Sequence, residues 1–594
     1  MADSTQRGNW SNWCEFLLSC VGCMVGIGNI WRFPFICYRS GGAAFLIPYF
    51  LAMAICGLPL VFLEMSYCQF SNLGPGKVWV ICPLFKGIGV GMIVLTGVIS
   101  CYYNVVLSWT LYYLSMSFSQ TLPWSTCDQI WNTPNCIDAF GARPLSNNSI
   151  NSTMLVYNVS RGNISGAVGD LTSNLTTSAT EEYWKYHVLQ ESTGLETMGS
   201  IRWPLVGCLF APWVCAFLCL IKGIKSSGKV VYVAATLPYF ILLALLIRGC
   251  LLPGAVEGVK YYVIPRWEKL LESKVWQDAA VQVFYSAGIG WGGISTLASY
   301  NKFNNNCYRD AMILPVLDCL TSWFAGFVIF VYLGYMAHIE GKSIDDVVTS
   351  GPGLTFVTYP HAVATMPLAQ LWSVLFFVML FLVGMDSQFV HIQTIITGIS
   401  DASPTIGKSS KYKMVLTAGL CCVGFLLGLP FVTQGGIHLL NLIDNYIASI
   451  SVMLLACFEV LVLSWCYGVE RLYGDISIMI GYRPTIIWKP LWMIISPAFI
   501  MVLWCFGIAD LYKKVLENNT ASWIVIIGVV IGVLPLLPIP TFAINVVKNM
   551  TGKSVTQKLR SSTKPSIKWK SVAESCDTTK EDDGLLHVPL TYIN

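Results

Sequence analysis

Charged side chains are scarce in this sequence. Of its 594 residues, 11% are Asp, Glu, Lys or Arg and 55% are apolar, whereas ordinary soluble domains carry about a quarter charged residues. The net charge of +4 is too small to indicate a nucleic acid partner. The composition therefore predicts a chain that exposes most of its surface to a lipid bilayer.

The sequence also lacks the motifs of common enzyme classes. No nucleotide-binding P-loop, metal-ligand cluster or nucleophile motif occurs among its apolar segments. This argues against an ATP-driven pump and makes an enzyme the least favoured class. Residues 1–11 are polar, and no cleavage pattern follows the first apolar stretch. We therefore expect no removable signal peptide and a cytosolic N-terminus.

The 22 cysteines do not form a disulfide framework. Most of them lie in apolar runs, where cysteine behaves as a small hydrophobic residue. The exception is the close pair Cys127 and Cys136, which lies in a polar segment. A disulfide between these two would place the segment on an oxidising, extracellular side.

Long apolar segments make up most of the chain. A membrane-spanning helix needs about 20 apolar residues, and the cost of unpaired backbone groups in lipid excludes soluble-type strands at these lengths. The sequence predicts an all-α polytopic membrane protein whose transporter domain covers 13–546. Its twelve predicted spans are 13–37, 42–69, 88–116, 205–221, 230–252, 276–299, 310–337, 368–398, 412–430, 437–465, 488–507 and 521–546.

The basic residues indicate the orientation of the chain. Lysine and arginine gather in the loops after the fourth, eighth and tenth spans and in the tail, and such residues favour the cytosolic side. These segments lie on the side of residues 1–12, so we expect a multi-pass plasma-membrane protein with both termini in the cytosol. The polar tail, residues 547–594, is expected to be disordered.

Residues 118–204 then form a large extracellular loop. This loop holds the Cys127/Cys136 pair and five N-x-S/T sequons, which are acceptors for N-glycosylation. One sequon is a frequent accident, but five together in a loop expected outside the cell indicate a glycoprotein. The sequons are at Asn147, Asn151, Asn158, Asn163 and Asn174.

The first and sixth spans are poor continuous helices. The first contains Gly26 and Gly28 with Arg32 close behind, and the sixth contains four glycines between Gly288 and Gly293. Glycine costs up to about 1 kcal/mol in a helix interior, and an intramembrane arginine costs at least about 2.5 kcal/mol. Interrupted spans in corresponding halves indicate a transporter site at the midplane. Close helix packing is the alternative, which suits one glycine pair better than both spans together.

Five motifs carry a family resemblance. They are Arg7-Gly-Asn-Trp10, VGIGNIWRFP from Val25, Tyr102-Tyr103-Asn104, the run 299–310 and MDSQF from Met385. Together they resemble the neurotransmitter:sodium symporters, in order from residue 7 to about 545. The resemblance implies a leucine-transporter-like fold with spans 1–5 and 6–10 as inverted repeats. It implies a substrate bound at the broken centres of spans 1 and 6. The glycine carriers and the broad-scope carrier of neutral and cationic amino acids are the most similar branches.

The resemblance implies two sodium sites made of oxygen donors, which a hard cation requires. Chloride would be a further ion, bound next to the first sodium. The first sodium site would use Met24, Asn29, Ser286 and Asp318; the second would use Gly22, Val25, Val383, Asp386 and Ser387; and the chloride site would use Gln282, Ser286 and Ser322.

Gly26 indicates the substrate class. Monoamine carriers of the family have an aspartate at this position that pairs with the substrate amine, so glycine leaves room for the carboxylate of an amino acid. Neutral, cationic and glycine-like substrates remain alternatives. The substrate residues implied are Gly26, Gly28, Ile99, Tyr103, Tyr285, Gly288, Trp291, Ser387 and His391. The outer gate would be Arg32 with Asp444, and the inner gate Arg7, Trp10, Tyr300 and Asp401.

Several residues depart from the family pattern. Asp318 stands where the family usually has asparagine, and Phe62 where several relatives have a chloride-binding tyrosine. An ionised Asp318 could supply the negative charge of chloride, which it would repel; a protonated Asp318 would merely mimic asparagine. For His391, a packed helix histidine is favoured over a substrate contact. Glu64 is expected to bind backbone N–H groups of the broken spans rather than ions.

These patterns predict a sodium-coupled symporter of amino acids that works by alternating access. The competing hypothesis is a receptor or accessory subunit that keeps the fold without coupled flux. The set Asn29, Asp386 and Ser387 argues that cation binding persists, and this favours symport.

Overall fold

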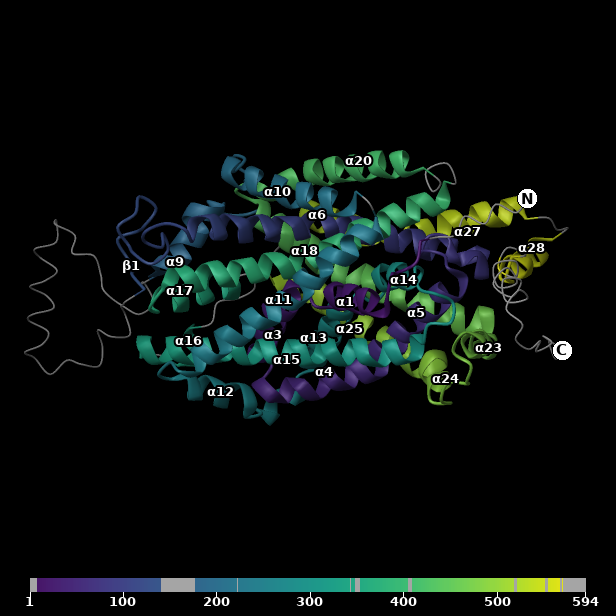
Figure 1. Ribbon diagram of the computed structural model, residues 1–594, viewed down its shortest axis with the longest axis horizontal. Coiled ribbons are helices and arrows are strands. Elements are labelled where there is room, and N and C mark those ends of the chain that lie inside the picture. Colours follow the sequence, from purple (N-terminus) through teal and green to yellow (C-terminus); the bar gives the residue numbers. More distant parts are fainter. Residues whose placement is uncertain are drawn as a thin grey trace, which may run out of the picture.

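The computed structural model describes residues 8–139, 177–221, 223–341, 343–347, 353–403, 409–517, 521–550, 554–566 and 569. Within these residues, nine helical stretches are long and apolar enough to cross a membrane, and two bent helix pairs raise the number to eleven. Most of the long helices lie along the long axis of the molecule (Figure 1). The predicted all-α polytopic architecture is confirmed.

Each of these eleven stretches coincides with one predicted span. Most of the observed helices extend a few residues beyond the apolar core that the sequence marks. The nine continuous stretches are Gly42–Ser71, Pro83–Met116, Trp203–Leu220, Gly228–Cys250, Cys307–Ile339, Ala369–Ala402, Ser410–Val432, Gly436–Ile480 and Trp488–Glu517, and the bent pairs are Trp13–Met24 with Ile27–Arg39 and Ser522–Leu536 with Pro538–Asn549.

The first span is broken at the predicted place. Helix α1 (Trp13–Met24) ends before Gly26, and the chain continues as α2 (Ile27–Ile30) and α3 (Arg32–Arg39). The two halves meet at 59°. The side chain of Asn29 turns back and accepts a hydrogen bond from the N–H of Gly26 at 3.1 Å, which replaces a helical bond lost at the break.

The sixth predicted span, 276–299, is also broken. It consists of α13 (Ser273–Ala287) and α14 (Gly293–Ala298), neither of which is long enough to cross a membrane alone. Between them Gly288, Gly290 and Gly292 have φ of 61°, 76° and 76°. Residues with a Cβ avoid this left-handed region, so these glycines allow the chain to leave helical geometry here.

The remaining elements complete the bundle. Helices α6 and α18 pack along each other, and α1 packs against α11, α15 and α18. The spanning elements are η1 (Gly42–Phe45), α4 (Leu46–Ala52), η2 (Met53–Gly57), α5 (Leu58–Ser71), η4 (Pro83–Phe85), α6 (Lys86–Met116), α10 (Trp203–Leu220), α11 (Ile224–Cys250), α15 (Cys307–Glu340), α18 (Ala369–Ala402), α20 (Ser410–Gly428), η8 (Leu429–Val432), α21 (Gly436–Ile447), η9 (Ala448–Val452), α22 (Met453–Leu461), η10 (Val462–Gly468), α23 (Val469–Ile480), α24 (Trp488–Pro490), η11 (Leu491–Ile495), α25 (Ser496–Glu517), α26 (Ser522–Val533), η12 (Leu534–Leu536) and α27 (Pro538–Asn549).

Short elements cover the two ends of the bundle. They are η3 (Val78–Ile81), β1 (Cys136–Ile137), β2 (Thr177–Ser178), α9 (Ala179–Glu182), η5 (Tyr183–Leu189), α12 (Ala255–Val263), η6 (Trp267–Leu271), α16 (Ile344–Val347), η7 (Leu354–Thr358), α17 (Tyr359–Ala364) and α28 (Val555–Ser562). Figure 1 shows β1 and α9 at one end and α23 and α28 at the other.

The β1–α9 end contains the one disulfide of the described residues. Cys127 is bonded to Cys136, as predicted, and β1 pairs in parallel with β2. The five sequons at Asn147, Asn151, Asn158, Asn163 and Asn174 lie outside the described residues, so glycosylation stays a prediction.

The tail is more ordered than the sequence suggested. Residues 554–566 include α28, and Trp569 is 5% exposed, with its ring 5.3 Å from Phe70 and its Nε1–H donating to the hydroxyl of Tyr467 at 3.3 Å. The expectation of disorder over 547–594 is therefore wrong for this part. A single tryptophan in a polar segment gave too weak a signal, because its apolar contacts come from distant elements.

Candidate functional site

A cavity of about 330 Å³ lies between the two broken helices. It is lined by residues of α2, α6, α13 and α18, which the sequence separates by hundreds of positions. Eight of the nine predicted substrate residues line it, namely Gly26, Gly28, Ile99, Tyr103, Tyr285, Trp291, Ser387 and His391. The ninth, Gly288, ends α13 instead.

Gly26 lies at the bend of the first span, where side chains of α6 and α18 come close to it. A Cβ on this residue would be 3.1 Å from Ser387 Oγ and 3.3 Å from Tyr103 Oη. The N–H of Ile27 donates to Tyr103 Oη at 3.3 Å, and Ser387 Oγ donates to the carbonyl of Gly22 at 3.0 Å. Hydroxyl and peptide groups therefore meet at the bend of the first span, and a side chain at position 26 would press on both hydroxyls.

Asn29 joins the two broken spans to α15. Its Nδ2 donates to Ser286 Oγ at 3.0 Å, to Asp318 Oδ1 at 2.7 Å and to Ser322 Oγ at 2.8 Å. Ser286 Oγ also lies 2.7 Å from both carboxylate oxygens of Asp318. Three of the residues predicted for the first sodium thus form one buried cluster. The fourth, Met24, accepts a bond from the Gly26 N–H through its carbonyl at 3.1 Å.

Asp386 has an unusual environment for a carboxylate. It is 2% exposed, and neither oxygen has a hydrogen-bond partner among the described residues. A small second cavity of about 10 Å³ is lined by Gly22, Val25, Val383 and Asp386, four of the five ligands predicted for the second sodium. A Cβ on Gly22 would lie 2.8 Å from Asp386 Oδ2, so glycine allows the close approach.

The predicted chloride residues include a further buried group without partners. Gln282 is fully buried, and neither side-chain atom is hydrogen-bonded within the described part of the chain. The assignment of Phe62 to the position of the chloride-binding tyrosine of several relatives, however, was wrong. Phe62 packs its ring against Tyr308, Trp488 and Trp492 and does not line the cavity.

Tyr49 is the tyrosine that lies beside this cluster, and the sequence analysis missed it. Its hydroxyl is buried next to Asp318 and Ser322 and, like Gln282, makes no well-formed hydrogen bond in the described chain. No motif of the sequence analysis includes Tyr49, so its place beside Asp318 could not be assigned from the sequence. Tyr49 is on the second predicted span and Asp318 on the seventh. The tilt and packing of these two helices decide which of their side chains meet.

The predicted outer gate is linked through a tyrosine. The guanidinium of Arg32 lies over the ring of Tyr285, 4.0 Å from its centroid. The hydroxyls of Tyr285 and Tyr102 donate to Asp444 Oδ1 at 3.1 and 2.9 Å. Arg32 and Asp444 do not form a direct ion pair among the described residues, so Tyr285 separates them and the cavity stays open on this side.

The opposite side of the cavity is closed by close packing. Trp10 donates from its backbone to the carbonyl of Tyr300 at 3.2 Å and from Nε1 to that of Leu297 at 3.0 Å. Asp401 accepts a bond from the N–H of Gly74 at 2.9 Å. Arg7 lies outside the described residues, so its gate role stays a prediction.

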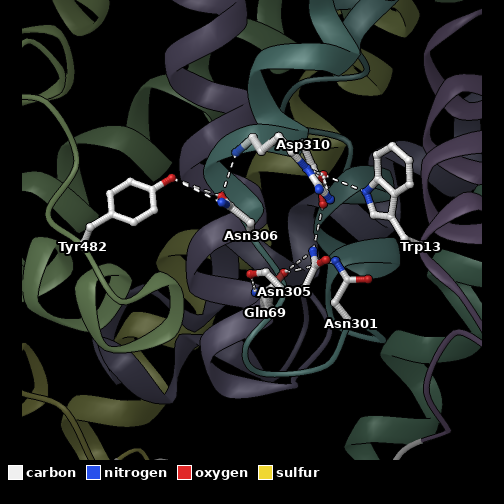
Figure 2. A network of polar contacts seen from close by, with 8 residues as sticks. Trp13, Gln69, Asn301, Asn305, Asn306, Asp310 and Tyr482 are labelled. Atoms are coloured by element: carbon white, nitrogen blue, oxygen red, sulfur yellow. Dashed lines mark hydrogen bonds and ion pairs between the residues drawn. The ribbon is translucent and has the colours of Figure 1, made fainter.

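A polar network lies near this closed side (Figure 2). Trp13 donates from Nε1 to Asp310 Oδ1 at 2.8 Å, and the guanidinium of Arg309 lies over the Trp13 ring at 4.5 Å. Asn305 Nδ2 donates to Asp310 Oδ2 at 2.8 Å and to Gln69 Oε1 at 3.2 Å. The network therefore ties α1 to α5 and to the start of α15.

Glu64 has the role expected for it. One carboxylate oxygen accepts a bond from the Gly290 N–H and the other from Ser295 Oγ, both at 2.8 Å. The hydroxyl of Thr96 donates to the carbonyl of Trp291 at 2.5 Å. Side chains of α5 and α6 thus satisfy the peptide groups that the broken sixth span exposes.

Two broken spans that face each other across a cavity are typical of secondary transporters. The model of the Sodium:neurotransmitter symporter family matches residues 7–550. The chain therefore belongs to this family, as the motifs around Gly26 and Asp386 indicated.

Curated relatives cover most of the chain. The sodium- and chloride-dependent glycine transporter 1 of Xenopus laevis is 42% identical over 96% of this chain and 88% of the relative. The sodium- and chloride-dependent glycine transporter 2 of Xenopus laevis is 44% identical over 85% of this chain and 65% of the relative. The sodium- and chloride-dependent creatine transporter 1 of Mus musculus is 44% identical over 86% of this chain and 79% of the relative.

Proposed function

We propose that this chain is a sodium-coupled symporter that carries a small neutral amino acid into the cell by alternating access. The observation that carries the proposal is the carboxylate of Asp386, which is buried without a partner beside the broken first span. A buried charge without a partner is costly, and a cation would supply that partner. Relatives whose names state sodium dependence support the same reading.

The second sodium would be held by oxygens of α1 and α18. Asp386 and Ser387 offer side-chain oxygens, and Gly22, Val25 and Val383 offer carbonyls. A hard cation requires such ligands. The cavity of about 10 Å³ that four of these residues line is close to the space of one small bound species. Because α1 belongs to a bent span and α18 to a continuous one, this ion would hold α1, the helix proposed to move, against α18.

The first sodium would lie in the Asn29 cluster. Asn29 now directs Nδ2 at the oxygens of Ser286, Asp318 and Ser322. A half-turn of the amide would direct Oδ1 there instead and convert a donor surrounded by acceptors into an all-oxygen site. The Gly26 N–H, which donates to both the Asn29 amide and the Met24 carbonyl, would then lose one of its two acceptors, and a substrate carboxylate could take that place.

The amino acid would bind at the bend of the first span. Its carboxylate would accept hydrogen bonds from the Tyr103 hydroxyl and from N–H groups near Gly26, since helix N-termini attract anions. Glycine at position 26 keeps this space free. Sodium bound close by would help to neutralise the carboxylate, which couples the binding of substrate to that of the ion.

We infer that the structure is the outward-open step of this cycle. The cavity reaches Lys274, Asp510 and Lys514 beyond Tyr285, while Trp10 packs against Tyr300 on the other side. Closing Arg32 onto Asp444 would cover the substrate, and releasing Trp10 would open the opposite path. We propose the plasma membrane as the location, with both termini in the cytosol and the β1–α9 end outside.

Asp318 would reduce the need for chloride. Burial opposes ionisation of this carboxylate, while its bonds from Asn29 and Ser286 and a sodium ion bound beside it would favour the ionised form. Ionised, it supplies a negative charge next to the first sodium and repels a second anion. The relatives are named as chloride-dependent, so weak chloride dependence would distinguish this chain from them.

The test is uptake of labelled glycine, alanine and serine into cells that express the chain, with sodium replaced by choline. We expect uptake to require sodium. The variant Asp386→Asn should raise the half-saturating sodium concentration at least tenfold, because it removes the unpaired charge. The matched control Glu257→Gln changes an exposed carboxylate paired with Lys260 and should behave as wild type.

Absence of sodium-dependent uptake, with surface expression demonstrated, would favour the receptor or accessory-subunit hypothesis. Sodium dependence that survives unchanged in Asp386→Asn would refute the second sodium site while leaving symport intact.

A further inference from the structure

His391 is a buried polar side chain of the cavity. It lies on α18 one turn after Ser387, lines the cavity and is 3% exposed. Its ring centroid is 5.6 Å from that of Tyr103 and 5.6 Å from that of Trp291. These three rings therefore close the space next to the bend at Gly26.

A neighbouring glutamine fixes which nitrogen of His391 carries the proton. Gln388 Nε2 donates to Ser100 Oγ at 2.6 Å and to the Ser100 carbonyl at 3.4 Å. This orients Oε1 of Gln388 toward His391 Nδ1, 3.4 Å away. Two lone pairs would repel each other at that contact, so Nδ1 carries the hydrogen.

The other nitrogen is then left as a hydrogen-bond acceptor. No carboxylate contacts the ring among the described residues, and burial among aromatic groups disfavours a charged imidazole. In a neutral imidazole with hydrogen on Nδ1, Nε2 has a free lone pair. No residue in the described part of the chain bonds to Nε2, so its partner has to come from the cavity.

The surroundings limit the size of that partner. Ile99 and Trp291 line the cavity beside His391, and Trp291 packs edge-on against Tyr285 at 5.4 Å. These aromatic and apolar groups surround the free acceptor on His391, so a small side chain that carries one donor suits this part of the cavity.

We propose that His391 makes this transporter selective for an amino acid with a hydroxymethyl side chain, serine, over alanine and glycine. The serine hydroxyl would donate to Nε2, and the Nδ1–H of His391 would keep its bond to Gln388. This assignment rests on the proposed function and names the substrate within it.

The experiment compares the transport of serine and alanine in the full-length chain. We expect kcat/KM for serine to exceed that for alanine by about tenfold, the effect of one hydrogen bond in a buried site. Alanine differs from serine only in lacking the hydroxyl, so the ratio isolates that bond. O-methylserine, which has the oxygen but no donor, should compete poorly.

Two variants separate hydrogen bonding from packing. His391→Phe keeps a ring but has no acceptor, and it should lower the serine-to-alanine ratio about tenfold. His391→Gln can present an amide oxygen near the position of Nε2, and it should retain a preference for serine. The control His338→Phe changes an exposed histidine at the far end of α15 and should keep the wild-type ratio.

The outcomes distinguish the two levels of the proposal. Sodium-dependent transport of all three amino acids, without a preference for serine or with a ratio unaffected by His391→Phe, would overturn the role of His391 and leave symport in place. Absence of sodium-dependent transport for every substrate would overturn both. A serine preference in the wild type that is lost in His391→Phe and kept in His391→Gln would support the assignment.

Discussion

At the residue scale, Asp318 is the position where one atom changes the ionic requirement. Its carboxylate shares a buried cluster with Asn29 and Ser286. Asparagine has the same shape but no charge, so the substitution Asp318→Asn tests the charge alone.

We predict that Asp318→Asn makes transport depend on chloride. The ratio of uptake in chloride to uptake in gluconate should be near one in the wild type and should rise at least about threefold in the variant, because the missing charge is then supplied by chloride. Initial rates of labelled amino acid uptake measure this ratio. Asp345→Asn, which alters an exposed partner of Arg266, is the control. An unchanged ratio in Asp318→Asn would indicate that Asp318 merely mimics asparagine.

The same cluster shows how far the sequence predicts a site. Asn29, Ser286 and Ser322 could be assigned because the family resemblance implies these positions. Tyr49 could not, since it lies 13 positions before the assigned Phe62 on the same span. The depth of a residue in the bundle depends on the tilt of its helix and on where the neighbouring helices begin. The hydrophobic periodicity of a single span holds no information about either.

At the element scale, both broken helices follow from composition. Glycine spacing predicted the breaks at Gly26 and at Gly288–Gly292, because few other residues tolerate the local geometry. The additional elements α12, α16 and α17 were not predicted. They lie in segments between spans where short apolar patches pack against the bundle, and their stability comes from contacts rather than from a strong local pattern.

We predict that Gly26→Ala abolishes most transport. The new methyl group would lie 3.1 Å from Ser387 Oγ and 3.3 Å from Tyr103 Oη and would occupy the space proposed for the carboxylate. Sodium-dependent kcat/KM should fall at least tenfold at equal surface expression. Gly419→Ala, where an added Cβ meets no atom within 4 Å, should transport normally. Normal rates in Gly26→Ala would refute carboxylate binding at this bend.

The network of Figure 2 holds the first half of the broken span. Trp13 on α1 is attached to α15 through Asp310 and Arg309. Movement of α1 away from the bundle would open the closed side of the cavity, and it would break these contacts first.

We predict that Trp13→Ala favours the state open on that side. A hydrogen bond to a carboxylate contributes about 1.5–3 kcal/mol, so losing it should shift the equilibrium by about tenfold or more. In inverted membrane vesicles, Cys23, which lines the cavity, should react faster with an impermeant thiol reagent, as measured by mass spectrometry of its peptide. Trp13→Phe, which keeps the ring over Arg309, should show a smaller increase. Equal labelling in all three proteins would exclude this role.

At the scale of the whole molecule, the two ends of the bundle are built differently. The end with α23 and α28 is held by contacts such as that between Trp569 and Phe70. The β1–α9 end is held by the Cys127–Cys136 disulfide and by stacked rings around His187. The sequence indicated the disulfide but not this ring cluster, whose members come from α6, the loop before β1 and η5.

His187 makes the stability of the β1–α9 end depend on pH. Its ring stacks on Tyr183 and lies tilted against Trp131 with centroids 3.8 Å apart, and its Nε2 lies 3.0 Å from the hydroxyl of Tyr112. Burial first, and then the nearby charge of Arg202, lower the pKa of His187 below its ordinary value of 6.5. The unfolded state therefore binds more protons than the folded state in this pH range. The contribution of His187 is complete above about pH 6.5 and is lost as the pH falls toward its lowered folded value.

We therefore predict that the melting temperature of the purified protein falls between pH 7.5 and pH 5.5, and that His187→Phe reduces this fall. Phenylalanine keeps the ring contacts with Trp131 and Tyr183 but cannot be protonated, so the difference in slope between variant and wild type isolates the histidine from every other titrating group. Thr193→Val, which removes an exposed hydroxyl that follows η5 in the chain, is the comparison and should keep the wild-type slope. A wild-type slope in His187→Phe would mean that protonation of His187 does not open the ring cluster, and that the stacked rings hold this end with either form of the imidazole.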